Sequence, residues 1–284
     1  MTMQSRIQLP LDGKWRFAPD PGNEGINFCG GWFDMDLPDE LILPGTTTKN
    51  HKGIQTQVIH KDRFSKKWQY TGTAWYQKSL DIPSEYSGKR IVLFLENPCS
   101  TMVWLDSERI GEQDLIDLPQ LYELGNQAYP GKHCLTIRCC NSPSRPMVYY
   151  HPRRANGITG RIELQITDKV WIRDVKVIPN LKLKLAELAI TLGNLTGRAV
   201  NGILCLKTAS KCGRHILQDK YVRFTIGHEQ TEKVLRFEMK MGDGILLWDE
   251  FEPNLYNMEV RGLAASKCWA FRISSARAAL WWAF

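Results

Sequence analysis

Apolar and polar residues alternate along most of this chain with the two-residue period of β-strands. Ile162, Leu164 and Ile166 alternate with polar residues, which predicts a half-buried strand, and residues 76–82 and 135–139 show the same alternation. Residues 89–97, KRIVLFLEN, are apolar on both parities, as in a strand that is covered on both faces. We find no convincing amphipathic helical stretch. The sequence therefore predicts an all-β fold.

The predicted strands form two groups that meet at residues 167–169, where one strand ends and the next begins almost without a turn. The second group consists of segments of strand length at 170–179, 185–193, 202–208, 216–226, 231–240 and 255–262. Six or seven strands in about 95 residues are typical of an immunoglobulin-like β-sandwich. We expect an antiparallel sandwich at 1–168, this immunoglobulin-like sandwich at 169–263, and a tail at 264–284.

The charge pattern indicates a solvated surface. The net charge is +7, and the lysines and arginines are spread along the chain. A nucleic-acid groove would need clustered basic residues with interleaved aromatic residues, and only YYHPRR at 149–154 comes near that composition. No run of about 18 apolar residues occurs, so we expect neither a nucleic acid nor a membrane as a partner.

The N-terminal residues, MTMQSRIQLPLDGKW, lack the apolar core of about 7–15 residues that a signal peptide needs. If Met1 is the true start, the chain stays in the cytoplasm. If a signal peptide has been removed, the protein is periplasmic or secreted, and the sequence leaves both open.

The chain has eight cysteines, and none forms a C-x-x-C pair. A zinc site therefore has little support, and we expect most of the thiols to be free, small and buried. We predict no metal site and no cofactor.

Several segments occur in the collinear order LDGKWRF, LPGTTT, YTGTAWYQKSLDIP, GKRIVLFLE, VWLDSERIG, NGITGRIEL and LWDEFEPNLYNMEV. In this order the chain resembles glycoside hydrolase family 2, which contains β-galactosidases, β-glucuronidases and β-mannosidases, over roughly residues 8–262. The resemblance implies a jelly-roll sugar-binding domain at 1–168, followed by the immunoglobulin-like domain. In the family a (β/α)8 barrel follows and carries both catalytic glutamates.

The length of the chain leaves no room for that barrel. It takes about 250 residues, whereas 284 − 262 = 22 residues follow Gly262. A retaining glycosidase needs two carboxylates about 5–5.5 Å apart, and in the family both come from the barrel. We therefore predict no catalytic residue here. Pairs such as Asp249–Glu250 and Asp34–Asp36 are interpreted as solvated charges.

We predict that this chain is the non-catalytic N-terminal portion of a family 2 glycosidase whose whole form hydrolyses terminal β-linked sugars. One alternative is a carbohydrate-binding module that works alone. Another is an accessory subunit that completes a separately encoded barrel.

Two loops are candidates for sugar contact. In the first, YYHPRRANG at 149–157, aromatic faces and hydrogen-bonding groups come from Tyr149, Tyr150, His151, Arg153, Arg154 and Asn156. In the second, LPGTTTKNHKG at 43–53, Thr47 and Asn50 are the candidates, together with Thr46 and His51. The alternative interpretation is structural in both: an exposed loop with an Asn-Gly turn, and ordinary loop composition.

The tail gives two hypotheses. Phe271 and Arg272 fit part of the family's link into its barrel, but beyond Ile273 the match dissolves. The tail contains the apolar cluster Trp281, Trp282 and Phe284, and exposed clusters of this kind tend to self-associate. A homo-oligomer is therefore a candidate assembly for this chain. Either the coding frame was lost after about Ile273, or SSARAALWWAF is a short helix that docks on the sandwich or on a partner.

Overall fold

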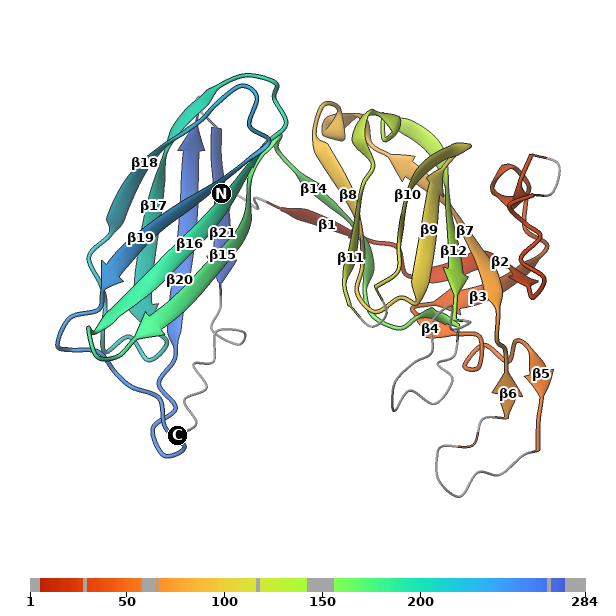
Figure 1. The fold of residues 1–284 in the computed structure, drawn as a ribbon, viewed down its shortest axis with the longest axis horizontal. Helices are drawn as coiled ribbons and strands as arrows, with labels where there is room; N and C mark the ends of the chain where they lie inside the picture. The colour runs from red at the N-terminus through yellow and green to blue at the C-terminus, as the bar shows by residue number, and fades with distance from the viewer. Residues whose placement is uncertain are drawn as a thin grey trace. The chain divides into compact units, whose positions relative to one another are not determined.

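The computed structural model describes residues 6–27, 30–57, 65, 67–115, 118–141, 156–264 and 267–273. These residues form β-strands joined by turns and short 3-10 helices at Trp32–Asp34, Ser84–Tyr86 and Gly125–Gln127, so the predicted all-β class is confirmed (Figure 1). The chain divides into two compact units. The first sandwich is Ile7–Ile166, and the second sandwich runs from Thr167 onward and includes Arg6.

The first sandwich contains two larger antiparallel sheets. One has four strands in the order β1-β14-β8-β11, and the other has six in the order β10-β9-β12-β7-β2-β3. The strands of the four-stranded sheet are β1 (Ile7–Pro10), β14 (Ile162–Thr167), β8 (Arg90–Leu95) and β11 (Gln120–Glu123). Those of the six-stranded sheet are β10 (Glu108–Gln113), β9 (Ser100–Leu105), β12 (Gly131–Cys140), β7 (Thr73–Ile82), β2 (Gly13–Asp20) and β3 (Asp39–Leu43). Two short pairs complete it: β4 (Gly45–Thr46) with β13 (Gly157–Ile158), and β5 (Ile54–Gln55) with β6 (Trp68–Gln69).

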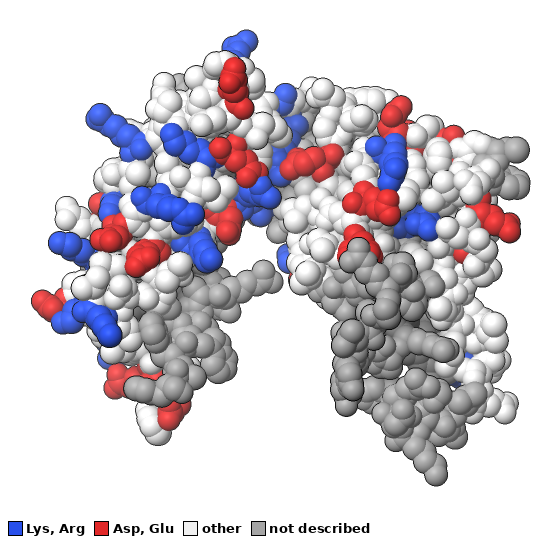
Figure 2. Space-filling model, viewed as in Figure 1, with Lys and Arg blue, Asp and Glu red and all other residues white. Residues whose placement is uncertain are grey.

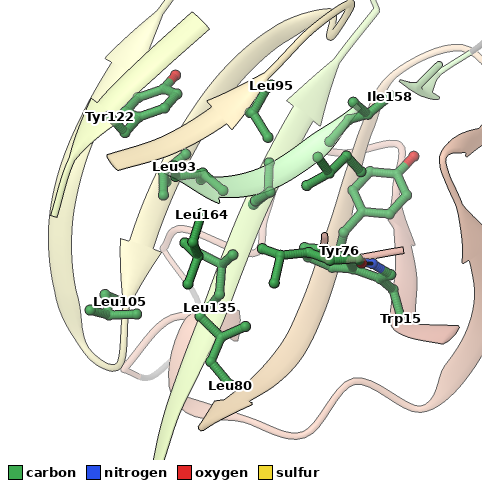
Figure 3. Close-up of a cluster of buried hydrophobic side chains, with 14 of the residues drawn as sticks. Trp15, Tyr76, Leu80, Leu93, Leu95, Leu105, Tyr122, Leu135, Ile158 and Leu164 are labelled. Atoms are coloured by element: carbon green, nitrogen blue, oxygen red, sulfur yellow. Dashed lines mark hydrogen bonds between the residues drawn. The ribbon is translucent and has the colours of Figure 1, made fainter. Parts of the chain in front are cut away.

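The core of the first sandwich lies between its two larger sheets. Leu93 and Leu164 from the four-stranded sheet and Tyr76 and Leu135 from the six-stranded sheet are buried there, and Figure 3 shows these side chains pointing toward one another. Trp15 is also buried, and its indole Nε1 donates to the Leu11 carbonyl at 2.8 Å. Burying such apolar area supplies the main stabilising free energy of a sandwich.

One local expectation is wrong. The alternation around Ile162, Leu164 and Ile166 predicts a half-buried strand, but all six residues of β14 are buried. On the face away from the core, Glu163 accepts hydrogen bonds from the side-chain amides of Gln8 at 3.0 Å and Gln165 at 2.8 Å. These hydrogen bonds offset the free-energy cost of burying polar side chains on this strand.

The second sandwich contains a three-stranded sheet, β15-β16-β19, and a four-stranded sheet, β18-β17-β20-β21. Its strands are β15 (Val170–Asn180), β16 (Leu185–Asn194), β17 (Val200–Ser210), β18 (Lys220–Ile226), β19 (Glu232–Lys240), β20 (Tyr256–Ala264) and β21 (Lys267–Ile273). Residues 168–169 alone separate β14 from β15. The sheet continues past 263, where the sequence predicts the end of this domain, because β21 pairs with β20 from Lys267 opposite Ala264 to Ile273 opposite Met258.

Two lysines link edge strands of the two sheets in the second sandwich. The Lys233 ammonium on β19 donates to the Thr225 carbonyl on β18 at 2.6 Å, and Lys220 on β18 donates to the Glu238 carbonyl on β19. These bonds occupy carbonyl groups that an exposed edge would otherwise offer to another chain.

Charged side chains of both signs are interspersed over the visible surface, as the spread of charge predicts (Figure 2). The described cysteines Cys99, Cys134, Cys139, Cys140, Cys205 and Cys212 are thiols without a disulfide bond, as expected. The expectation that most are buried is wrong for these six, because only Cys99 and Cys139 are buried and Cys212 is exposed. Among the described residues, no helix is long and apolar enough to cross a membrane.

Candidate functional site

The two loops predicted to face sugar meet in the first sandwich. β4 comes from the loop at 43–53, β13 comes directly after Asn156, and the two pair antiparallel with Gly157 opposite Thr46. The candidates Tyr149, Tyr150, His151, Arg153 and Arg154 lie outside the described residues, so their role stays a prediction. The described site therefore consists of Asn156 and the 43–53 loop.

Gly157 allows this close approach of the two loops. Its φ is +139°, which L-residues with a side chain rarely adopt, and a Cβ there would lie 2.3 Å from the Gly45 carbonyl oxygen. The neighbouring backbone bond runs from the Thr47 N–H to the Asn156 carbonyl at 2.8 Å. The Asn-Gly dipeptide thus fixes the first loop against the second.

The side chain of Asn156 is fully buried and bonded within the sandwich. Its Oδ1 accepts from the Tyr76 hydroxyl at 2.6 Å, and its Nδ2 donates to the carbonyls of Gly72 at 2.8 Å and Cys139 at 3.0 Å. Both amide hydrogens are used, so these contacts are those of a structural side chain. A sugar contact by Asn156 stays a prediction, and with both amide hydrogens used it would have to be made by the second lone pair of Oδ1 or by displacing a partner.

The Tyr76 hydroxyl is a part of this site that sequence reasoning missed. Burial raises the pKa of Tyr76 well above its ordinary value, so the phenol stays protonated and donates to Asn156. Its inward parity in the 76–82 segment is the signal that marks it as buried. That signal does not reveal its partner, which lies 80 residues away in sequence.

Asn141 and Tyr70 form a second missed pair beside this site. Asn141 Oδ1 accepts from the Gly72 N–H at 2.8 Å, and its Nδ2 donates to the Tyr70 carbonyl at 3.1 Å. The Tyr70 hydroxyl accepts from the Asp20 N–H at 2.9 Å and donates to the Thr73 carbonyl. Burial raises the pKa of Tyr70 to about 12. Two asparagines, 141 and 156, thus hold the backbone around Gly72.

Asn50 closes the 43–53 loop. Its Oδ1 accepts from the Ile42 N–H at 2.8 Å, and its Nδ2 donates to the carbonyls of Ile42 and Thr46, each at 2.9 Å. The Thr46 hydroxyl accepts from the Lys49 N–H at 3.1 Å. These bonds are those of a self-capping loop, and a sugar contact by Asn50 stays a prediction.

Thr47 differs from its neighbours in the loop. It is fully buried, and its Oγ1 has no hydrogen-bond partner within the described part of the chain. The next hydroxyl, Thr48 Oγ1, donates to the Trp68 carbonyl at 3.0 Å, and His51 is exposed with its ring centroid 6.0 Å from that of Trp68. Within the described part of this loop, the Thr47 hydroxyl is therefore the one buried side-chain polar group that has no hydrogen-bond partner.

The carboxylates interpreted as solvated charges are indeed exposed. Asp34 accepts from the Ser107 hydroxyl, Asp36 pairs with Arg16, and Asp249 Oδ1 accepts from the N–H groups of its own turn. Within the described residues, no group of three or more His, Cys, Asp or Glu side chains has the arrangement of a metal site. The described part of the site consists of hydrogen-bonding groups, and most of them bind the fold itself.

Comparison with protein-family models gives no match. Two curated relatives are a β-glucuronidase of Paenibacillus borealis, 26% identical over 123 residues, and a β-galactosidase of Thermoanaerobacter pseudethanolicus, 22% identical over 277 residues. They align with 43% and 92% of this chain, which in turn spans only 19% and 34% of their lengths.

Solved structures share the fold over nearly the whole chain. A calcium-binding mutant of Bacteroides uniformis β-glucuronidase 2 matches with a TM-score of 0.74 and 15% identity, covering 94% of this chain and 32% of its own. A glycosyl hydrolase family 2 member from Bacteroides cellulosilyticus matches with a TM-score of 0.68 and 18% identity, covering 94% and 36%. The predicted resemblance of this chain to the N-terminal β-domains of glycoside hydrolase family 2 is therefore confirmed.

Proposed function

We propose that this chain is a non-catalytic portion of a family 2 β-glycosidase, whose whole form hydrolyses terminal β-linked sugars with carboxylates that lie outside these 284 residues. The observation that carries the proposal is the coverage: 94% of this chain matches only 32–36% of the glycosidase structures named above. The catalytic barrel of the family belongs to the part that this chain does not span.

In this role the first sandwich is a support for loops rather than a complete binding site. Asn156 and Asn50, which the sequence marks as sugar contacts, bind backbone groups of their own sandwich. A monosaccharide held only by an open loop loses the enclosure on which small-molecule affinity depends. Substrate affinity is therefore a property of the whole enzyme.

Isothermal titration of the purified chain with glucuronic acid, galactose and mannose tests this assignment. We expect no saturable heat at millimolar sugar, because the side-chain amides of Asn156 and Asn50 in the described site are already paired within the fold. A dissociation constant in the micromolar range for any of the three would contradict the proposal. It would favour a carbohydrate-binding module that works alone.

A further inference from the structure

Three connections of the second sandwich gather at one end of it. They are the turn at 181–184 between β15 and β16, the segment at 211–219 between β17 and β18, and the loop at 241–255 between β19 and β20. Because all of these strands pair antiparallel, the three connections lie at the same end of the sandwich. We call this surface the apolar end, for the side chains described below.

Hydrogen bonds join the three connections into one surface. The Met241 N–H donates to the Lys184 carbonyl at 2.8 Å, which ties the long loop to the first turn. The Arg214 guanidinium donates to Asn254 Oδ1 at 3.0 Å, which ties the same loop to the second connection. The apolar end is therefore a fixed arrangement of three segments.

This end carries large hydrophobic side chains with unusual exposure. The exposed fractions are 65% for Leu183, 72% for Ile216, 52% for Leu247 and 87% for Phe251. Phe251 lies in a turn that Asp249 caps by accepting from the Phe251 N–H at 2.9 Å. Single exposed apolar residues are ordinary, but four on adjoining segments of one end indicate a binding surface.

The chain itself leads to this surface. β21 begins at Lys267 opposite Ala264, which is far from the apolar end, and finishes at Ile273 opposite Met258, which is close to it. The next 284 − 273 = 11 residues are SSARAALWWAF. Fully extended, they reach at most roughly 36–40 Å, so they can cover any part of this end.

The composition of that segment complements the surface. It contains Leu280, Trp281, Trp282 and Phe284, one cation at Arg277, and no acidic side chain. The loop at 241–255 carries the exposed acids Asp243, Asp249, Glu250 and Glu252 around its apolar residues. The three connections also carry the exposed cations Lys182, Lys184, Lys211 and Arg214, and Lys184 pairs with Asp243 at 2.7 Å. The fit of the segment to this end therefore rests on the apolar side chains of both and not on charge.

We propose that residues 274–284 bind to the apolar end of the second sandwich, with their aromatic residues covering Phe251 and Ile216. This binding is independent of the proposed glycosidase role, since it involves no sugar contact. It removes large aromatic side chains and the exposed apolar end from water in one step, which the hydrophobic effect favours.

Trypsin cleavage after Arg277 tests the proposal on the full chain, with release of the peptide AALWWAF followed by mass spectrometry. The variant Ile216→Asp/Phe251→Asp should release the peptide at least about tenfold faster than the unmodified chain, because it removes the covering contacts. The variant Trp281→Ser/Trp282→Ser, which lies outside the described fold, should give the same acceleration.

The matched control is Leu195→Asp. Leu195 is 44% exposed and lies in the turn after β16, at the opposite end of the second sandwich. It should leave the cleavage rate unchanged. Equal rates for the unmodified chain and the Ile216/Phe251 variant would overturn the proposal. Protection that grows with protein concentration would also overturn it, because the occupant would then be a second copy of the chain.

Discussion

At the scale of one residue, Thr47 differs from its neighbours because the described part of the fold does not use its side-chain hydroxyl as a hydrogen-bonding group. Its neighbours Thr46, Thr48 and Asn50 all bond to the loop or to Trp68, whereas its own hydroxyl is buried without a described partner. An unpaired buried hydroxyl costs free energy of folding, so its removal is a direct test of what this group contributes.

Replacing Thr47 with valine keeps the shape and removes the hydroxyl. We expect Thr47→Val to raise the free energy of unfolding by about 1 kcal/mol, or to leave it unchanged, in urea denaturation. The matched variant Thr48→Val should lower it by about 1 kcal/mol, because its hydroxyl donates to the Trp68 carbonyl. Clear destabilisation by Thr47→Val would show that the hydroxyl has a partner after all.

Cys212 is the described thiol with the most distinctive surroundings. The Arg214 Nε–H points at its sulfur from 3.3 Å, the Ser210 hydroxyl lies 3.4 Å away, and together they lower the pKa of Cys212 to about 7. Both contacts favour the thiolate over the thiol. The exposed sulfur should therefore react at lower pH than an ordinary cysteine.

Alkylation with iodoacetamide, quantified on the peptide that contains Cys212, measures this directly. The rate should reach half of its maximum near pH 7, and Arg214→Ala should move that midpoint upward toward the ordinary thiol pKa of 9.0. Lys211→Ala removes a neighbouring cation that does not contribute to the shift and should leave the midpoint in place. A midpoint that Arg214→Ala does not change would contradict the role of the guanidinium.

At the scale of elements, the pairing of β4 with β13 depends on Gly157. Gly157→Ala would place a Cβ 2.3 Å from the Gly45 carbonyl, so the two short strands would have to separate. Gly131→Ala is a matched control, since Gly131 has a similar φ of +134° but no atom within 4 Å of the added Cβ.

We expect Gly131→Ala to lower the free energy of unfolding by about 1–2 kcal/mol, the conformational cost alone. Gly157→Ala should cost at least about 2 kcal/mol more, because a backbone clash adds to the same conformational cost. Urea denaturation of both variants gives the comparison. Equal losses in the two variants would show that the approach of the two loops contributes no strain.

The position of a strand can be predicted from the alternation of neighbouring residues, but the strand with which it pairs cannot. The inward residues Leu135, Ile137 and Cys139 are all fully buried, as their parity predicts. Alternation does not predict the burial of β14, where Glu163 is buried and accepts a hydrogen bond from Gln8, which lies 155 residues away. β21 lies in the segment expected to be a tail, although Trp269, Phe271 and Ile273 occupy alternate positions there, and its pairing with β20 identifies it as a strand.

The same distinction applies to the site. The sequence marks Asn156 as a polar residue of an exposed loop with an Asn-Gly turn, but the structure begins strand β13 at Gly157 and buries Asn156. Its partners Tyr76, Gly72 and Cys139 come from separate segments, so only the folded sandwich reveals that they occupy its amide. Residue type therefore predicts a polar site, but it cannot predict which polar groups remain free.

At the scale of the whole molecule, the chain consists of two sandwiches, and the chemistry of its relatives requires more than these. The described carboxylates Asp36 and Asp249 are exposed and bonded to the fold, and the chain spans about a third of the glycosidase structures that it resembles. Hydrolysis needs an acid and a nucleophile placed on either side of a glycosidic bond. These observations are consistent with the proposal above, in which this chain provides support and not turnover.

Hydrolysis of aryl β-glucuronide and aryl β-galactoside by the purified chain tests this claim most directly. The protein should come from a host that lacks both activities, with a mock purification as the blank. We predict product formation no faster than in the blank. Turnover that rises in proportion to the concentration of the chain would contradict this inference, because it would place a complete catalytic site within these 284 residues.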